Sequence, residues 1–163
     1  MRMPVVIDVE SSGFGRGGYP IEVGLVLPDG SPHCFLISPV RGWTNWDEEA
    51  ESVHGISREV LDMHGRPARD VAERLNALLA GKTVYSDAWA FDMPWLGKLF
   101  DAVGMEQTFR VAALQELMTP QQFDSWSTVR LSVEQDMKLK RHRASGDARI
   151  LQETFRRTSG QAA

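Results

Sequence analysis

The feature that most constrains the fold of this chain is a short β-branched segment near its start that carries two acids. Residues 4–9 read Pro-Val-Val-Ile-Asp-Val and predict a strand, and Glu10 follows directly. Asp8 and Glu10 are two positions apart, so they share one face of the predicted sheet with Val6. Two partly buried carboxylates repel each other and lose hydration, and a divalent cation relieves both costs. The pair predicts a metal site, with an exposed edge strand carrying ordinary acids as the alternative.

The rest of the chain predicts a mixed α/β fold. Two further strands, at 21–27 and 33–38, follow closely enough to form an antiparallel meander with the first. After them, short helices alternate with strands; the helices are expected at 48–53, from Ser57, and at 69–79, 92–103, 112–118, 120–139 and 145–158, and the strands at 83–86 and 108–111. This order indicates a mixed sheet flanked by helices. No linker separates two cores, so we expect a single domain over residues 1–163, with its core at about 4–158.

Composition limits the partners of the chain. Eighteen Lys and Arg against 22 Asp and Glu give a net charge of −4, which argues against a protein that coats long duplexes. An enzyme that grips one end of a nucleic acid remains compatible with this charge. The single Cys34 excludes an internal disulfide and fits a reducing, cytoplasmic setting. No apolar run approaches the length of a membrane span, and Asp8 interrupts the apolar stretch that a signal peptide needs.

Three polar residues later in the chain add to the acidic pair. Asp92 lies two residues before Pro94, so it can be a helix N-cap or a metal ligand. His142 and Asp147 lie in a basic segment at the start of the last predicted helix. They can be a solvated loop histidine beside a capping acid. They can also be a general base beside a metal-binding carboxylate, because the ordinary pKa of histidine is about 6.5.

Taken together, these motifs resemble those of the DEDDh (DnaQ-like) 3′–5′ exonucleases. The family is marked by D-x-E, a later Asp and H-x4-D, which here are Asp8-Val9-Glu10, Asp92 and His142 with Asp147. Ile21–Gly24 and Val53–Ile56 match two lesser motifs. The resemblance implies an RNase H-like fold with a central five-stranded mixed β-sheet flanked by α-helices. One departure is Asp87, in a region where the family often has Asn, which adds negative charge near the site.

The resemblance also implies a mechanism that uses two divalent cations, Mg²⁺ or Mn²⁺. Asp8, Glu10 and Asp147 would hold one ion, Asp8 would bridge to the second, and Asp92 would join directly or through water. His142 would accept the proton of the attacking water. The product would be a nucleoside 5′-monophosphate.

Contacts to the substrate are also expected. The candidates are Ser11, Ser12, Phe14, His54 and Trp89. A loop aromatic is the alternative for Phe14, a helix-capping histidine for His54 and a core aromatic for Trp89. Phosphates could be contacted by four basic residues, for which a solvated helix end is the alternative: Lys138, Lys140, Arg141 and Arg143.

The expected substrate is the 3′ end of single-stranded RNA or DNA. Sixteen residues follow Asp147, which favours a small free-standing enzyme that trims short RNA or single-stranded ends over a proofreading enzyme, with RNA slightly favoured over DNA. Related small nucleases often pair, so a homodimer is included among the expected partners. The alternatives are a DNA repair 3′–5′ exonuclease and a catalytically weak nucleic-acid-binding domain of the same fold.

Overall fold

The centre of the protein is a five-stranded mixed sheet with the strand order β3-β2-β1-β4-β5. The structure is a computed structural model and describes residues 2–160. Its strands are β1 (Val6–Ser11), β2 (Pro20–Val26), β3 (Pro32–Leu36), β4 (Thr83–Ser86) and β5 (Arg110–Ala113). The first three form the expected antiparallel meander, and β4 and β5 extend it in parallel.

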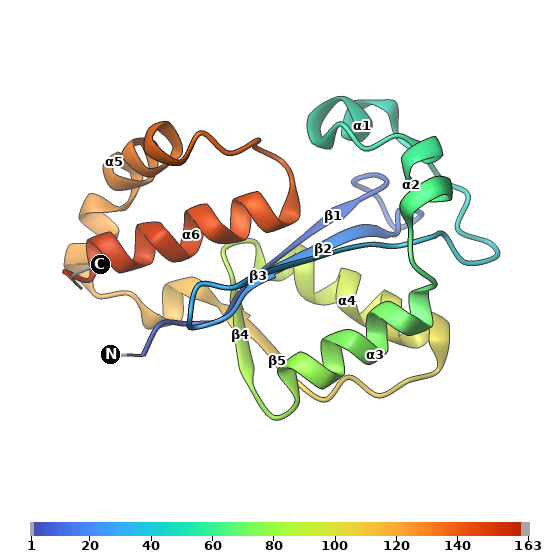
Figure 1. Cartoon of the computed structure of the whole chain (residues 1–163), viewed down its shortest axis with the longest axis horizontal. Coiled ribbons are helices and arrows are strands. Elements are labelled where there is room, and N and C mark those ends of the chain that lie inside the picture. The colour runs from blue at the N-terminus through green and yellow to red at the C-terminus, as the bar shows by residue number, and fades with distance from the viewer. Residues whose placement is uncertain (1, 161–163) are drawn as a thin grey trace.

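Helices cover both faces of this sheet (Figure 1). On one face lie α6 (Ala144–Thr158) and, packed against it, α5 (Pro120–Met137); on the other lie α3 (Ala68–Leu79) and α4 (Trp89–Val103). Two short helices, α1 (Glu48–His54) and α2 (Arg58–His64), lie near the end of β1, and a 3₁₀ turn, η1 (Leu114–Leu117), follows β5. Within residues 2–160, no helix is long and apolar enough to cross a membrane.

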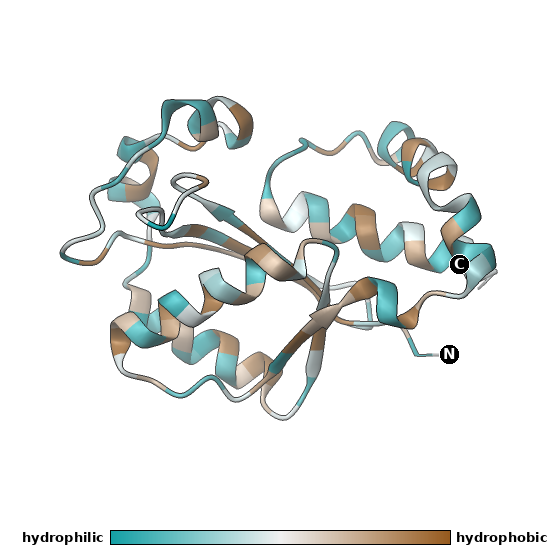
Figure 2. Cartoon of the chain, turned by 180° about the vertical axis from the view of Figure 1, so that it is seen from behind, coloured by the Kyte–Doolittle hydropathy of each residue, from teal (hydrophilic) through white to brown (hydrophobic). Residues whose placement is uncertain are grey.

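The alternation of side chains along β1 decides what each face of the sheet carries. Ile7 and Val9 belong to the core between the sheet and α3 and α4, whereas Val6 packs under α6. Figure 2 shows apolar residues along the central strands and polar residues on the outer surfaces of the helices. The face that carries Val6 also carries Asp8 and Glu10, as expected from their spacing, and α6 covers this face.

Two predicted boundaries are wrong around the last strand, and one is wrong at the first. β1 runs from Val6 to Ser11 rather than over 4–9, so that Glu10 lies inside the strand. β5 begins at Arg110 instead of 108, and the helix predicted at 112–118 is only the short turn η1. Both β1 and β5 are therefore shifted two residues toward the C-terminus relative to the prediction.

The start of α4 also differs from the prediction. The Oγ of Ser86 accepts a hydrogen bond from the N–H of Ala88 at 2.9 Å, and the helix begins at Trp89, five residues before Pro94. Asp92 therefore lies in the first turn of α4, and the N-cap role considered for it is wrong. Pro94 lies inside α4, beyond the first N–H groups that have no partner within the helix, so its missing N–H leaves the carbonyl of Ala90 without its i→i−4 donor.

Candidate active site

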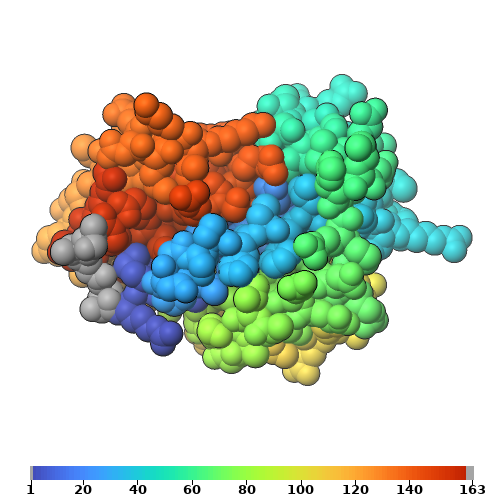
Figure 3. Space-filling view, viewed as in Figure 1, coloured from blue at the N-terminus to red at the C-terminus, as the bar shows by residue number. Residues whose placement is uncertain are grey.

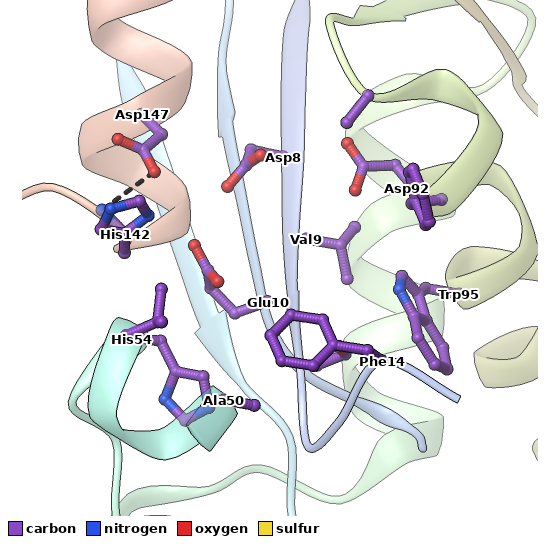
Figure 4. A pocket seen from close by; sticks show the side chains of 14 residues that line it. Asp8, Val9, Glu10, Phe14, Ala50, His54, Asp92, Trp95, His142 and Asp147 are labelled. Carbon is purple, nitrogen blue, oxygen red and sulfur yellow. Dashed lines mark hydrogen bonds between the residues drawn. The ribbon is translucent and has the colours of Figure 1, made fainter. Parts of the chain in front are cut away.

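A cavity of about 350 Å³ lies at the end of β1. The five residues that mark the DEDDh resemblance all line it: Asp8, Glu10, Asp92, His142 and Asp147. Figure 4 shows that they come from three directions, with β1 in the middle, α6 and its preceding loop on one side, and α4 on the other. Figure 3 shows the surface hollowed between α1 and the segment before α6.

Three of these acids converge closely enough to share one ion. One carboxylate oxygen each of Asp8, Glu10 and Asp147 lies within 4.8 Å of the others. The buried Oδ2 of Asp8 and Oδ1 of Asp147 have no hydrogen-bond partner among residues 2–160. Buried carboxylate oxygens without a partner are unusual, and a bound cation satisfies them. The three side chains therefore fit a divalent cation held by oxygen ligands.

Burial and mutual repulsion shift the protonation of these acids. Desolvation raises the pKa of Asp8 well above its usual range, and the charges of Asp92, Glu10 and Asp147 add to this. Desolvation also raises the pKa of Glu10 to about 8, with Asp147 and Glu22 contributing, and that of Asp92 to about 7. Without a cation the cluster therefore retains protons at neutral pH, and a divalent ion would replace them.

Asp92 enters the cavity where two strands separate. Within the described chain, β1 and β4 pair at Val6 and Tyr85, whereas β1 and β2 stay paired to the end of β1. The first turn of α4 fills the gap that this separation leaves. There, Oδ2 of Asp92 accepts a hydrogen bond of 2.6 Å from the Oγ of Ser86. The same hydroxyl therefore accepts the N–H of Ala88 and donates to Asp92.

The start of α6 is held against β2 by a buried glutamate. Glu22 is fully buried, and its carboxylate accepts the N–H of Ala144 at 2.7 Å and pairs with Arg143 at 2.7 Å. Gly24 lets the helix approach, since a Cβ at this position would lie 2.1 Å from the backbone of α6. A carboxylate at a helix N-terminus is electrostatically favourable. The Ile21–Gly24 motif therefore has a structural role, which is to fix the first turn of α6 and with it Asp147.

His142 lies immediately before α6 with its side chain exposed at the cavity. Its backbone is left-handed, with φ of 57°, and its N–H donates to Oδ2 of Asp147 at 3.0 Å. A non-glycine residue in this conformation is held there by its surroundings at a cost of order 1–3 kcal/mol. The acid of the H-x4-D motif therefore ties the backbone of the histidine and leaves the imidazole unrestrained.

Three of the five expected substrate contacts line the cavity. They are Ser11, Phe14 and His54. Phe14 is 69% exposed, so its ring is accessible to a ligand in the cavity. His54 ends α1, and its Nδ1 accepts the N–H of Ile56 at 3.0 Å. The C-cap of α1 is Gly55, so the helix-capping alternative for His54 is wrong; its imidazole binds the backbone just beyond the helix and lines the cavity.

Ser12 and Trp89 are placed differently from the expectation, because neither lines the cavity. Ser12 is fully buried, and its Oγ accepts the N–H of Tyr19 at 3.0 Å. The indole N–H of Trp89 donates to the carbonyl of Val111 at 3.0 Å, which ties the ring to β5. Their polar groups are already used within the fold, so their placement does not support a contact with the substrate.

Two aromatic residues that were not among the expected substrate contacts also line the cavity. Phe91 and Trp95 are one helical turn apart on α4, and Phe91 is 66% exposed. An i, i+4 pair on one face of a helix could have revealed them, once the helix was known to begin at Trp89.

The charged residues near the cavity are mostly paired. Arg143 is held by Glu22, so the phosphate contact considered for it would require that ion pair to break. Asp87 does not line the cavity, and its carboxylate forms an ion pair of 3.1 Å with Arg130 of α5. The negative charge that distinguishes this chain from the family pattern is therefore partly balanced.

Comparison with solved structures identifies the fold. No protein-family model matches the sequence, and no curated protein matches it. Exonuclease I of E. coli in complex with a dA16 oligonucleotide matches with a TM-score of 0.68 and 14% identity, over 94% of this chain and 40% of that chain. The zinc-bound form of the E. coli enzyme with single-stranded DNA matches with a TM-score of 0.65 and 15% identity, over 95% and 40%. Exonuclease I of Methylocaldum szegediense matches with a TM-score of 0.58 and 14% identity, over 78% and 30%.

This chain has the fold of exonuclease I. The RNase H-like architecture expected from the motifs is confirmed, and the matching structures are of the DnaQ-like DEDDh type that the motifs resemble. The chain spans about 40% of the length of the E. coli enzyme. At this identity the likeness establishes the architecture, and the reaction has to be argued from the cavity.

Proposed function

We propose that this chain is a metal-dependent 3′–5′ exonuclease of the DEDDh type, which hydrolyses single-stranded nucleic acid to nucleoside 5′-monophosphates. The observation that carries the proposal is the convergence of four acids and one exposed histidine in a single cavity. The complexes of exonuclease I with single-stranded DNA support this class of substrate.

Each side chain of the cavity has a defined task in this proposal. Asp8, Glu10 and Asp147 would hold metal, and Asp92 would complete the site, through the oxygen ligands that Mg²⁺ and Mn²⁺ prefer. Two divalent ions bound there would activate the attacking water and stabilise the leaving 3′-oxygen. His142 accepts the proton of that water at an imidazole nitrogen, because its ring is exposed at the cavity while its backbone is tied to the acidic centre.

The other walls of the cavity suit the end of a strand. Phe14, Phe91 and Trp95 offer aromatic surface on which a base can stack. The volume of about 350 Å³ lies at the small end of the range for ligand pockets, which suits one terminal nucleotide better than a folded duplex. Both features favour removal of nucleotides from an end over cleavage within a strand.

The matching structures of exonuclease I contain DNA, whereas RNA as the substrate stays a prediction. A DNA exonuclease acting in repair is therefore the second candidate. A contact to the 2′-hydroxyl would distinguish the two, since that group is what lets a protein tell RNA from DNA.

The test is incubation of 5′-labelled single-stranded RNA and DNA with the protein and Mg²⁺ or Mn²⁺. We expect a ladder that shortens from the 3′ end, and none with Asp8→Ala. Asp62→Ala, which removes an exposed acid of α2 outside the cavity, is the matched control and should behave as the wild type. No ladder on either polymer, or equal activity of Asp8→Ala, would contradict the proposal.

A further inference from the structure

Asp147 lies close to the positively charged side chain of Arg141. The Nε of Arg141 lies 3.6 Å from Oδ1 of Asp147, and its Nη1 lies 2.9 Å from Oε1 of Glu134. Oδ1 is the oxygen that has no hydrogen-bond partner among residues 2–160, while Oδ2 is held by the N–H of His142. Arg141 therefore faces the one oxygen of Asp147 that is open to a metal ion.

The guanidinium of Arg141 is positioned by α5 rather than by the helix that carries Asp147. Glu134 of α5 is shared with Arg130, at 3.2 Å, and Arg130 reaches Asp87 just after β4 at 3.1 Å. These contacts form a chain of ion pairs from the α4 side of the cavity to the α6 side. The side chain of Arg141 is 43% exposed at the end of this chain of ion pairs, so it has room to move.

The distances allow Arg141 to exchange partners. At 3.6 Å the guanidinium balances the charge of Asp147 but makes no hydrogen bond, so the lone pairs of Oδ1 stay available. A divalent ion at the same oxygen carries twice the charge and repels the guanidinium. Glu134 offers the displaced group a carboxylate with which it is already paired.

We propose that Arg141 is a built-in counter-ion of the metal site, which balances Asp147 in the metal-free protein and is drawn away by Glu134 when the metal binds. The inference rests on the proposed function, because it takes Asp147 as a metal ligand. Arg141 is then a positioning residue that competes with the metal, and the two partners of one ion pair have opposite effects. Removal of the Arg141 side chain strengthens metal binding. Removal of the Glu134 carboxylate leaves the guanidinium of Arg141 on Asp147 and weakens metal binding.

The test is calorimetric titration of the full chain with Mn²⁺, using the wild type, Arg141→Gln, Glu134→Gln and the double variant. We expect roughly three- to tenfold tighter binding for Arg141→Gln and a similar loss for Glu134→Gln. The double variant should bind as Arg141→Gln does, because Glu134 acts through Arg141. If both charges acted only through space, the effects would add and the double variant would bind as the wild type, which would overturn the inference.

Matched controls come from an ion pair near the other end of α6. Arg157→Gln and Asp136→Asn remove the same charges from a pair of 2.6 Å and should leave metal affinity unchanged. Thermal unfolding in a chelator gives a second readout, in which Arg141→Gln should lower the Tm because Asp147 loses its cation. A simple loop anchor would lower both the Tm and the metal affinity, and that result would also overturn the inference. Absence of metal binding by the wild type would instead overturn the proposed function itself.

Discussion

The two sides of the cavity are fixed by different kinds of interaction. On the α6 side, Asp147 is placed by the buried carboxylate of Glu22, which pairs with the partly exposed Arg143, and the contact from Glu22 to the start of α6 spans 122 residues. On the α4 side, Asp92 is placed by the hydroxyl of Ser86, only six residues away. Asp92 is therefore held by a local hydrogen bond, and the helix that carries Asp147 by a long-range ion pair. We call the α6 side the charged side of the cavity, and the α4 side, which carries Phe91 and Trp95, the aromatic side.

The largest effect is expected for the base on the charged side. His142→Asn keeps a residue that tolerates the left-handed backbone and keeps the N–H that binds Asp147. Turnover should fall by about 10²- to 10⁴-fold while metal affinity is preserved. Single-turnover kinetics and calorimetry measure the two quantities. Loss of metal binding in this variant would show that the histidine is structural instead.

The metal-free protein should lose stability as the pH rises from about 5 to 8. Folding raises the pKa of Glu10 from 4.5 to about 8 and that of Asp92 from 3.8 to about 7. Groups with a raised pKa stabilise the fold fully below their unfolded pKa and lose that contribution as the pH passes the folded value. Thermal unfolding in a chelator should show this decline, and Glu10→Gln and saturating Mg²⁺ should each flatten it. A Tm that rises over this range in the wild type would contradict the assignment.

Glu22→Gln tests the long-range contact of the charged side. It leaves Arg143 without its charged partner and weakens the anchor of α6, so the free energy of unfolding should fall by about 3 kcal/mol. Denaturation by urea measures the change. Glu59→Gln, at an exposed position of α2, is the control and should change stability by less than about 0.5 kcal/mol. An equally small effect of Glu22→Gln would mean that other contacts hold the helix.

The aromatic side should control binding of the strand. Phe14→Ala removes an exposed ring from the cavity and should raise KM by roughly five- to 160-fold, from the usual value of about 1–3 kcal/mol for one stacked base. Trp89→Phe keeps an aromatic ring outside the cavity and should leave KM unchanged. Steady-state kinetics on a short single strand compares the two. A larger effect at Trp89 than at Phe14 would reverse the assignment.

The smallest effect on stability is expected for the local hydrogen bond between Ser86 and Asp92 on the aromatic side. Ser86→Ala removes the hydroxyl that binds Asp92 and should cost about 1–2 kcal/mol of stability, less than Glu22→Gln. It should also raise the pKa of Asp92 further, because that hydrogen bond lowers it. Urea denaturation and an NMR titration of the carboxyl groups would measure both. If Ser86→Ala costs more than Glu22→Gln, the contrast between the two sides fails.

The sequence was most informative where a rule of local geometry applied. The spacing of two between Asp8 and Glu10 predicted their common face, because side chains alternate along any strand. The N-cap rule failed at Asp92, because it gave weight to Pro94, whereas α4 begins at Trp89 and its N-cap is Ala88. The sequence did not predict this earlier start, nor the exposed position of Phe91 at the cavity.

Other features depend on packing that no local rule describes. The motif around Glu22 could be recognised, but its contact with Arg143 exists only because α6 lies across β2. The pairing of Arg141 with Glu134 likewise depends on how α5 and its following loop turn back toward Asp147. Pairs of charges between separate helices have no fixed spacing, so the sequence gives their residue types and not their partners.

The docking of α6 on β2 has a consequence for the synthesis of the protein. Asp8 and Glu10 are synthesised before Asp92, His142 and Asp147, and all five strands precede α6 in the chain. Asp147 and His142 join the other acids only when this last helix reaches Glu22. A nascent chain that ends after β5 therefore carries all five strands of the sheet but lacks His142 and Asp147 of the proposed catalytic site. If the proposed function holds, a nascent chain is inactive until α6 has been synthesised and has docked on β2.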